Sequence, residues 1–239
     1  MNYTVAEPDV LRPLVNELYD KLQSSDQYGL WSGKMGLSVF MFHYARLTGH
    51  KDFERKASDL LDEVCENVND SLSLSFSSGL LGIATSIEYL IQNSFIEGGS
   101  DELLGELDIL FHNQIISRSN FENVNLKNGL CGLGYYLYYR LNKKRDDNEN
   151  LITLKNKLNL VRWIDWLEDS LDFVSEEKDW DDVYYLMNLI HSLNIINFKV
   201  DKILRKTVLR FTLGWNNVEI VNNYEYLGIP LLKLLKPWI

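Results

Sequence analysis

Cysteine and histidine are scarce in this 239-residue sequence, which contains two cysteines and four histidines. The cysteines, Cys65 and Cys131, lie far apart. Two reduced thiols fit this spacing better than the disulfide framework of a small secreted protein, although one bridge is compatible with it. The histidines form no His-x-x-x-His pair, and the cysteines form no Cys-x-x-Cys pair. The common short metal-binding motifs are therefore missing from the sequence.

Positively charged residues are also few: the sequence has 24 Lys and Arg residues and 34 Asp and Glu residues, which gives a net charge of −10. This balance opposes binding to phosphate backbones and acidic membrane faces, so we expect no nucleic-acid partner. No window approaches the roughly 20 apolar residues that cross a bilayer, and MNYTVAEPDV resembles no signal peptide. We expect a soluble, cytoplasmic protein with no membrane partner.

What the sequence does contain is a glycine pattern that returns three times. Two glycines three residues apart open each of three apolar runs: Gly33 and Gly36, Gly79 and Gly82, and Gly129 and Gly132. The first glycines of successive pairs are 46 and 50 residues apart, which is enough for two helices and two turns. Since glycine leaves one side of a first helical turn bare, another backbone can approach it closely. The pattern predicts repeated helical hairpins with a shared packing geometry.

Hydrophobic periodicity predicts apolar inner helices that alternate with amphipathic outer helices. The expected inner helices cover 33–48, 77–92, 129–141, a stretch near Trp180 and 224–235; the expected outer helices cover 9–24, 52–68, 101–116, 151–174 and 199–213. Gly49 suits a left-handed helix cap, and 142–150 suits a solvated loop. Only 217–221 has an ambiguous strand-like pattern. With 46% hydrophobic residues, we expect one all-α domain over residues 1–239, built from about five hairpins.

Three stretches of the chain resemble the lanthionine synthetase C-like family, the cyclases of lanthipeptide biosynthesis. They are GLWSGKMGLSVFMFHYARLTG, SFSSGLLGIATSIEYL and LKNGLCGLGYYLYYRL, and the likeness covers most of the chain. The resemblance implies an α/α toroid, in which inner helices surround a central cavity and outer helices wrap them. The chain is short for such a ring, so ring closure is left undecided. In the family, zinc in the cavity activates a peptide cysteine for addition to a dehydrated Ser or Thr.

The sequence departs from the family at the zinc ligands. The family supplies them as a Cys-Tyr-Gly motif and a Cys-His-Gly motif, immediately before glycines of inner helices. The matching positions hold Trp31-Ser32, Ser77-Ser78 and Lys127-Asn128, and the fourth repeat offers Asp179-Trp180. None of the side chains in the first three pairs is an ordinary zinc ligand, and the fourth pair offers neither the thiolate nor the imidazole of the family motifs. We therefore expect no metal site and no cofactor.

Several residues remain as candidates for lining a cavity. Cys131 lies at a helix start, where the helix dipole lowers the pKa of a thiol, yet packing as a small apolar residue is the favoured interpretation. His43 falls late on an inner helix, where a core position is favoured over a ligand role. The aromatic candidates suit peptide contacts, sugar contacts or an ordinary core. They are Trp31, Tyr89, Tyr135, Tyr139, Trp180 and Tyr184.

The resemblance favours a role in ribosomal peptide maturation. We expect a non-catalytic subunit that binds a precursor peptide or a modifying enzyme, and an incomplete ring would offer an apolar edge to a partner or a second copy. One alternative is an active peptide cyclase or transferase with an unrecognised metal site. Another is a carbohydrate-active enzyme on an α/α toroid, with Asp181 and Asp182 as its acids. Acids at this place are more typical of helix capping and favourable dipole contacts.

Overall fold

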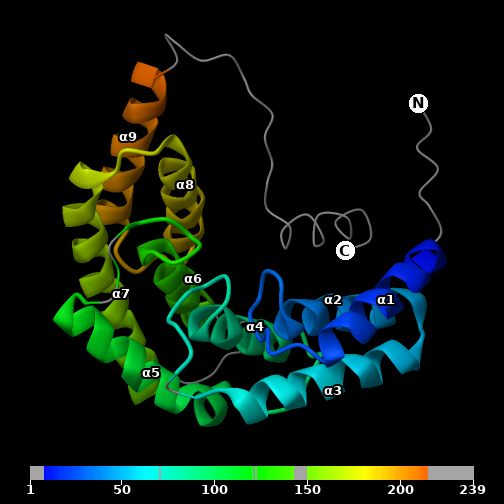
Figure 1. Cartoon of the computed structure of the whole chain (residues 1–239). Coiled ribbons are helices and arrows are strands. Elements are labelled where there is room, and N and C mark those ends of the chain that lie inside the picture. Colours follow the sequence, from blue (N-terminus) through cyan, green and yellow to red (C-terminus); the bar gives the residue numbers. More distant parts are fainter. Residues whose placement is uncertain (1–7, 70, 120, 122, 143–149, 215–239) are drawn as a thin grey trace. The chain divides into compact units, whose positions relative to one another are not determined.

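Alternating apolar and amphipathic stretches produce a chain of helices in the computed structural model, which describes residues 8–69, 71–119, 121, 123–142 and 150–214 (Figure 1). Every regular element in these ranges is helical. The helices fall into two compact units, which divide between Ser73 and Leu74. The expectation of one domain over residues 1–239 stays a prediction.

The first unit contains a 3-10 turn η1 (Pro8–Leu11) and the helices α1 (Arg12–Gln23), α2 (Lys34–Thr48) and α3 (Lys51–Asn67). Helix α2 is the inner helix and is buried over most of its length. Gly49 adopts φ 75° and ends α2 in the left-handed conformation, as expected, so that α3 can return along the outside. One face of α3 is buried: Phe53, Ala57, Leu60, Leu61 and Val64.

Helices α1 and α3 run in the same direction on the outside of α2. Arg12 pairs with Asp52 at 3.6 Å, and Lys56 Nζ donates to Asn16 Oδ1 at 2.7 Å, so both contacts join residues 40 positions apart. The apolar residues of this segment are buried to different extents. In α1, Val15 and Tyr19 are buried and Leu14 is exposed, so α1 contacts α2 through the side that carries Val15 and Tyr19.

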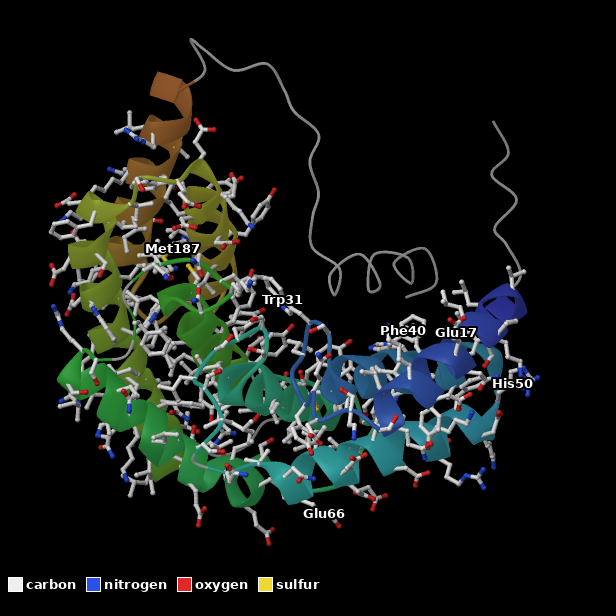
Figure 2. All side chains as sticks on the ribbon, viewed as in Figure 1. Glu17, Trp31, Phe40, His50, Glu66 and Met187 are labelled. Atoms are coloured by element: carbon white, nitrogen blue, oxygen red, sulfur yellow. The ribbon has the colours of Figure 1, made fainter. Side chains whose placement is uncertain are left out.

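The second unit contains three helical hairpins. Their inner helices are α4 (Leu80–Gln92), α6 (Leu130–Leu141) and α8 (Glu177–His191), and their outer helices are α5 (Ser100–Ser117), α7 (Leu151–Ser170, continued by η2, Leu171–Phe173) and α9 (Asn197–Gly214). Helix α6 contacts α4 on one side and α8 on the other, and α7 likewise contacts both α5 and α9. The interior between the helices is apolar, with Met187 of α8 among its fully buried side chains (Figure 2).

Polar contacts fix the outer helices of this unit in a parallel register. Between α5 and α7 three contacts follow one another in ascending order: Asp101 with Asn150 at 2.8 Å, His112 with Asn159 at 2.6 Å, and Arg118 with Asp169 at 2.7 Å. Three ion pairs then join α7 to α9 in ascending order along both helices: Asp165 with Lys199, Glu168 with Lys202, and Asp172 with Lys206. Because the outer helices are parallel to one another, the inner helices must also run parallel, as in a two-layered helical repeat.

The all-helical class and the alternation of inner and outer helices are confirmed for the described residues. The fourth inner helix, α8, forms without a glycine pair. The expected inner helix at 224–235, the ambiguous segment 217–221 and most of the loop 142–150 lie outside the described residues. Closure of the helices into a toroid stays a prediction. In the described ranges, no helix combines the length and the apolar character that crossing a membrane requires.

Candidate functional site at the starts of the inner helices

The leading glycines occupy equivalent positions at the starts of three inner helices. Gly33, Gly79 and Gly129 are the N-cap residues of α2, α4 and α6, with φ of −116°, −129° and −112° and extended ψ values. The second glycine of a pair allows a very close approach. A β-carbon at Gly36 would lie 2.0 Å from the carbonyl oxygen of Leu30, which is sterically impossible. The neighbouring backbone here is the loop before the helix.

This loop also satisfies the N–H groups at the helix start. Lys34 N donates to Gln27 O at 2.8 Å, and Leu130 N donates to Asn123 O at 3.0 Å, in each case to a residue seven positions earlier. Cys131 N donates in the same way to Val124 O at 3.1 Å. The first N–H groups of a helix form an anion site when they are free. These donors are already occupied by the chain itself.

Cys131 lies on the first turn of α6 and is fully buried. Burial raises the pKa of its thiol well above the ordinary value of 9.0, and the nearby carboxylates of Asp182 and Asp179 raise it further. Desolvation therefore outweighs the favourable end of the helix dipole, and Cys131 is a protonated thiol at neutral pH. This agrees with the favoured interpretation of Cys131 as a packing residue.

Asp182 connects α8 to the loop before α6. Its Oδ2 accepts a hydrogen bond of 2.8 Å from the backbone N–H of Leu126. Burial raises the pKa of the carboxyl group from 3.8 to about 6, against the lowering effect of this hydrogen bond. Asp182 therefore changes its charge close to neutral pH, as a general acid or base does. Asp181 precedes Asp182 on α8, so its side chain is rotated by about 100° about the helix axis, and it is exposed. The two carboxylates therefore do not face each other.

One predicted aromatic residue, Tyr135, lies close to Cys131 and Asp182. The ring of Tyr135, one turn after Cys131, lies 5.8 Å from the ring of Phe76. Burial raises the pKa of the Tyr135 phenol, and Cys131 and Asp182 raise it further. Trp180, on the first turn of α8, is buried, and its indole N–H meets no acceptor in the part of the chain that is described. The structure thus brings Cys131 and Tyr135 together with Asp182.

The other predicted aromatic residues of the second unit lie elsewhere. The ring of Tyr139, near the end of α6, lies 6.1 Å from that of Tyr89 on α4 and 5.4 Å from that of Tyr138. Burial raises the pKa of Tyr139 to about 12. Tyr184 is half-buried on α8 and contacts Tyr185 at 5.8 Å between ring centres. These tyrosines add aromatic surface to all three inner helices of the unit.

Trp31 and His43 belong to the first unit. Trp31 lies half-buried in the loop before α2 (Figure 2). His43 is a buried residue of α2, and burial, with a smaller effect of the Arg46 charge, lowers its pKa to about 4. Its imidazole is therefore neutral at neutral pH, which suits the expected core position. A cavity shared by these two residues and the second unit stays a prediction.

The sequence interpretation missed a buried charge cluster near the end of α6. The Arg140 guanidinium donates to Glu88 at 2.7 Å, to Asp101 at 2.8 Å and to Asp108 at 2.6 Å, and Tyr136 also donates to Asp108 at 2.6 Å. The cluster joins α4, α5 and α6. The sequence did contain an indication of this cluster, because Glu88 and Arg140 are lone charged residues within otherwise apolar inner helices.

A two-layered repeat of helical hairpins, with glycine pairs at three inner-helix starts, is now established, and the family comparison agrees with it. The model of the lanthionine synthetase C-like protein family matches residues 24–182, which is more than half of the chain. The chain therefore belongs to the lanthionine synthetase C-like family. The matched region includes all three glycine pairs, Cys131 and Asp182. A search of curated proteins finds no match.

The residues at the starts of α4 and α6 do not fit the zinc ion of the family. Where the relatives carry ligands before the glycines, this chain has Ser77-Ser78 and Lys127-Asn128. Ser77 N and Ser75 Oγ both donate to the carbonyl oxygen of Lys127, at 3.0 and 2.8 Å, so these residues tie the two helix starts together. Within the described ranges, no three His, Cys, Asp or Glu residues gather closely enough to hold a metal ion.

Proposed function

We propose that this protein is a non-catalytic member of the lanthionine synthetase C-like family that binds a peptide in the cytoplasm during ribosomal peptide maturation. Its partner would be a precursor peptide or an enzyme that modifies one. The observation that carries the proposal is the state of Cys131. Cys131 follows Lys127-Asn128, one of the family's ligand positions, by three residues, yet it is fully buried and its raised pKa opposes the thiolate form that zinc binds.

The inner helices provide surface that suits peptide binding. Tyr89, Tyr139 and Tyr184 are half-buried, one on each inner helix of the second unit, so each keeps part of its ring accessible. Tyrosine offers a large apolar ring and a polar hydroxyl at a low cost in conformational entropy, and it is enriched at protein interfaces. A peptide held by these rings would need no metal ion.

The proposal is tested by peptide binding. A labelled precursor peptide encoded beside the gene should bind the purified chain, and Tyr184→Ala should weaken that binding about tenfold, since a well-packed aromatic contact contributes about 1 kcal/mol or more. Phe198→Ala is the matched control, because Phe198 is an exposed aromatic residue on α9, the outer helix of the same hairpin. If the chain binds neither the peptide nor the product of a neighbouring gene, the proposal is wrong.

Zinc content separates this proposal from an active cyclase. Elemental analysis of the purified protein should find no stoichiometric zinc, with or without added metal. Stoichiometric zinc that is lost in Cys131→Ala or His43→Ala would instead support the cyclase and would contradict a non-catalytic role.

One observation favours a second candidate, an acid-dependent enzyme such as a carbohydrate-active protein. Burial raises the pKa of Asp182 to about 6, within the range of a working general acid. Such an enzyme needs a second carboxylate opposite the first, and Asp181 does not take that position. Turnover of an oligosaccharide that disappears in Asp182→Asn, while peptide binding is absent, would establish this alternative.

A further inference from the structure

The outward face of α5 and α7 exposes apolar side chains around one polar contact. His112 of α5 and Asn159 of α7 meet at 2.6 Å. Ile109 and Ile116 are three residues before and four residues after His112, so they lie on the same side of α5, beside α7. Both are largely exposed, at 60% and 56%. Two isoleucines of α5 are therefore exposed to solvent beside the contact with α7. Figure 1 shows the two helices.

Helix α7 continues this surface with two leucines and two cations. Lys155 and Arg162 are four residues before and three residues after Asn159, so they flank the same contact on the α7 side. Leu151 and Leu158 each precede one of these cations by four residues, and they are 68% and 46% exposed. We call this surface the α5/α7 face: Ile109, Ile116, Leu151, Leu158, Lys155, Arg162 and, on α5, Glu102 and Glu106.

Charge on the α5/α7 face is balanced and divided between the helices. Its anions, Glu102 and Glu106, are on α5, and its cations, Lys155 and Arg162, are on α7. None of the four makes an ion pair with another described residue. The whole chain carries a net charge of −10, so two copies repel each other over most of their surfaces. The α5/α7 face lacks this excess charge.

We propose that the α5/α7 face is the surface through which two copies of this chain associate. The division of charge fixes the arrangement, because α5 of one copy must lie against α7 of the other to bring Glu106 near Lys155. A two-fold axis parallel to the helices produces this pairing twice. The exposed isoleucines and leucines are then covered between the two helix pairs. This inference is independent of the proposed function, since it involves outer helices only.

The size of the face sets the expected strength of the dimer. Helix α5 has 18 residues, and 18 residues of helix span about 27 Å. Two adjacent helices at a spacing of about 10 Å present a width of about 20 Å, which gives about 500 Å² for each copy. The total of about 1,000 Å² is at the lower limit for a specific interface. The association should therefore be reversible, with a dissociation constant in the micromolar range.

Sedimentation equilibrium tests the proposal over protein concentrations from about 1 µM to about 500 µM. The wild-type chain should pass from monomer to dimer across this range. Ile109→Glu and Leu158→Glu should each raise the dissociation constant at least about tenfold, because each would bury a charge in the interface. The control is Leu209→Glu on α9, where the leucine is 61% exposed and lies outside the face. It should dimerise like wild type, and circular dichroism should show equal helix content in all variants.

Charge reversal supplies a second test that does not depend on apolar contacts. Glu106→Lys alone should weaken the dimer, and so should Lys155→Glu with Arg162→Glu in one chain, because like charges then meet. An equimolar mixture of the two variants should dimerise again, since each mixed pair restores both attractions. A chain that is monomeric at every concentration overturns the proposal. A dimer that Leu209→Glu disrupts and Ile109→Glu leaves intact also overturns the proposal. The proposal is equally wrong if the chain is a monomer that binds another protein through the α5/α7 face.

Discussion

The two ends of the inner helices in the second unit bury polar groups in different ways. Near the end of α6, Arg140 is matched by three carboxylates, and the side chains of Arg140 and Glu88 are almost completely buried. Near the start of α8, Asp182 accepts a single backbone N–H, and its pKa rises to about 6. In the first arrangement each carboxylate accepts a hydrogen bond from the Arg140 guanidinium. The second is sensitive to pH, and such sensitivity is typical of functional sites.

The largest expected effect comes from removing Arg140, the cation of the cluster near the end of α6. Arg140→Met should lower the free energy of unfolding by about 3–5 kcal/mol, because Glu88 and Asp108 would stay buried without their cation. Urea denaturation followed by circular dichroism measures this change. Arg118→Met is the control, since its ion pair with Asp169 is exposed and should contribute less than about 1 kcal/mol. Equal losses in the two variants would show that the cluster is no stronger than a surface ion pair.

The next effect concerns the close approach at the start of α6. A β-carbon at Gly129 would lie 2.6 Å from both Asn123 O and Asn125 N. Gly129→Ala should therefore destabilise the protein by about 1–3 kcal/mol, since backbone must move to admit the methyl group. Gly105→Ala in α5 is the matched control, with nothing within 4 Å, and it should be neutral or stabilise by up to about 1 kcal/mol. Thermal unfolding measures the stability of both variants. If Gly129→Ala were as stable as wild type, the close approach at Gly129 would be contradicted.

A smaller effect on stability is expected at Asp182, near the start of α8, and it depends on pH. Since the folded pKa of Asp182 is raised from 3.8 to about 6, its contribution to stability is greatest below pH 3.8 and is lost as the pH rises to about 6. Asp182→Asn keeps an oxygen that accepts from Leu126 N–H but removes the charge. It should be close to wild type at pH 4 and more stable by about 1 kcal/mol at pH 8, after allowance for solvent screening. Urea titrations at both pH values measure the difference, and an equal shift at both would contradict it.

The smallest effect is chemical and leaves the fold unchanged. Cys131 is buried, whereas Cys65 is exposed on α3. Burial raises the pKa of both thiols, so accessibility decides which one reacts. Iodoacetamide should therefore modify Cys65 alone in the folded protein and both cysteines in urea. Peptide mass mapping locates the label, with Cys65→Ser as the control that should remain unlabelled when folded. Rapid labelling of Cys131 in folded Cys65→Ser would show that the start of α6 is accessible.

The sequence predicted the helices well because their signals are local. Apolar spacing located α2 at 33–48, against an observed Lys34–Thr48, and it located α8 without a glycine pair. The end of α2 at Gly49 was also predicted, since a left-handed cap strongly favours glycine. These features depend on residues within one or two helical turns of each other.

The candidate site was predicted only in part, because its contacts join distant residues. Cys131, Tyr135 and Trp180 were named from their places on inner helices. The bond from Leu126 to Asp182 spans 56 residues, and the bond from Arg140 to Glu88 spans 52. Hydrophobic periodicity does not reveal which charge meets which at such separations.

The loops that close over the starts of α2 and α6 have an evolutionary consequence. Each loop satisfies main-chain donors of its own helix with carbonyls seven residues earlier, as in Lys34 to Gln27 and Leu130 to Asn123. A hairpin with its preceding loop is therefore a module that carries its own helix start. Duplication or loss of such a module leaves these bonds intact in the others. Chain length in this architecture should accordingly change by whole modules more readily than by single turns.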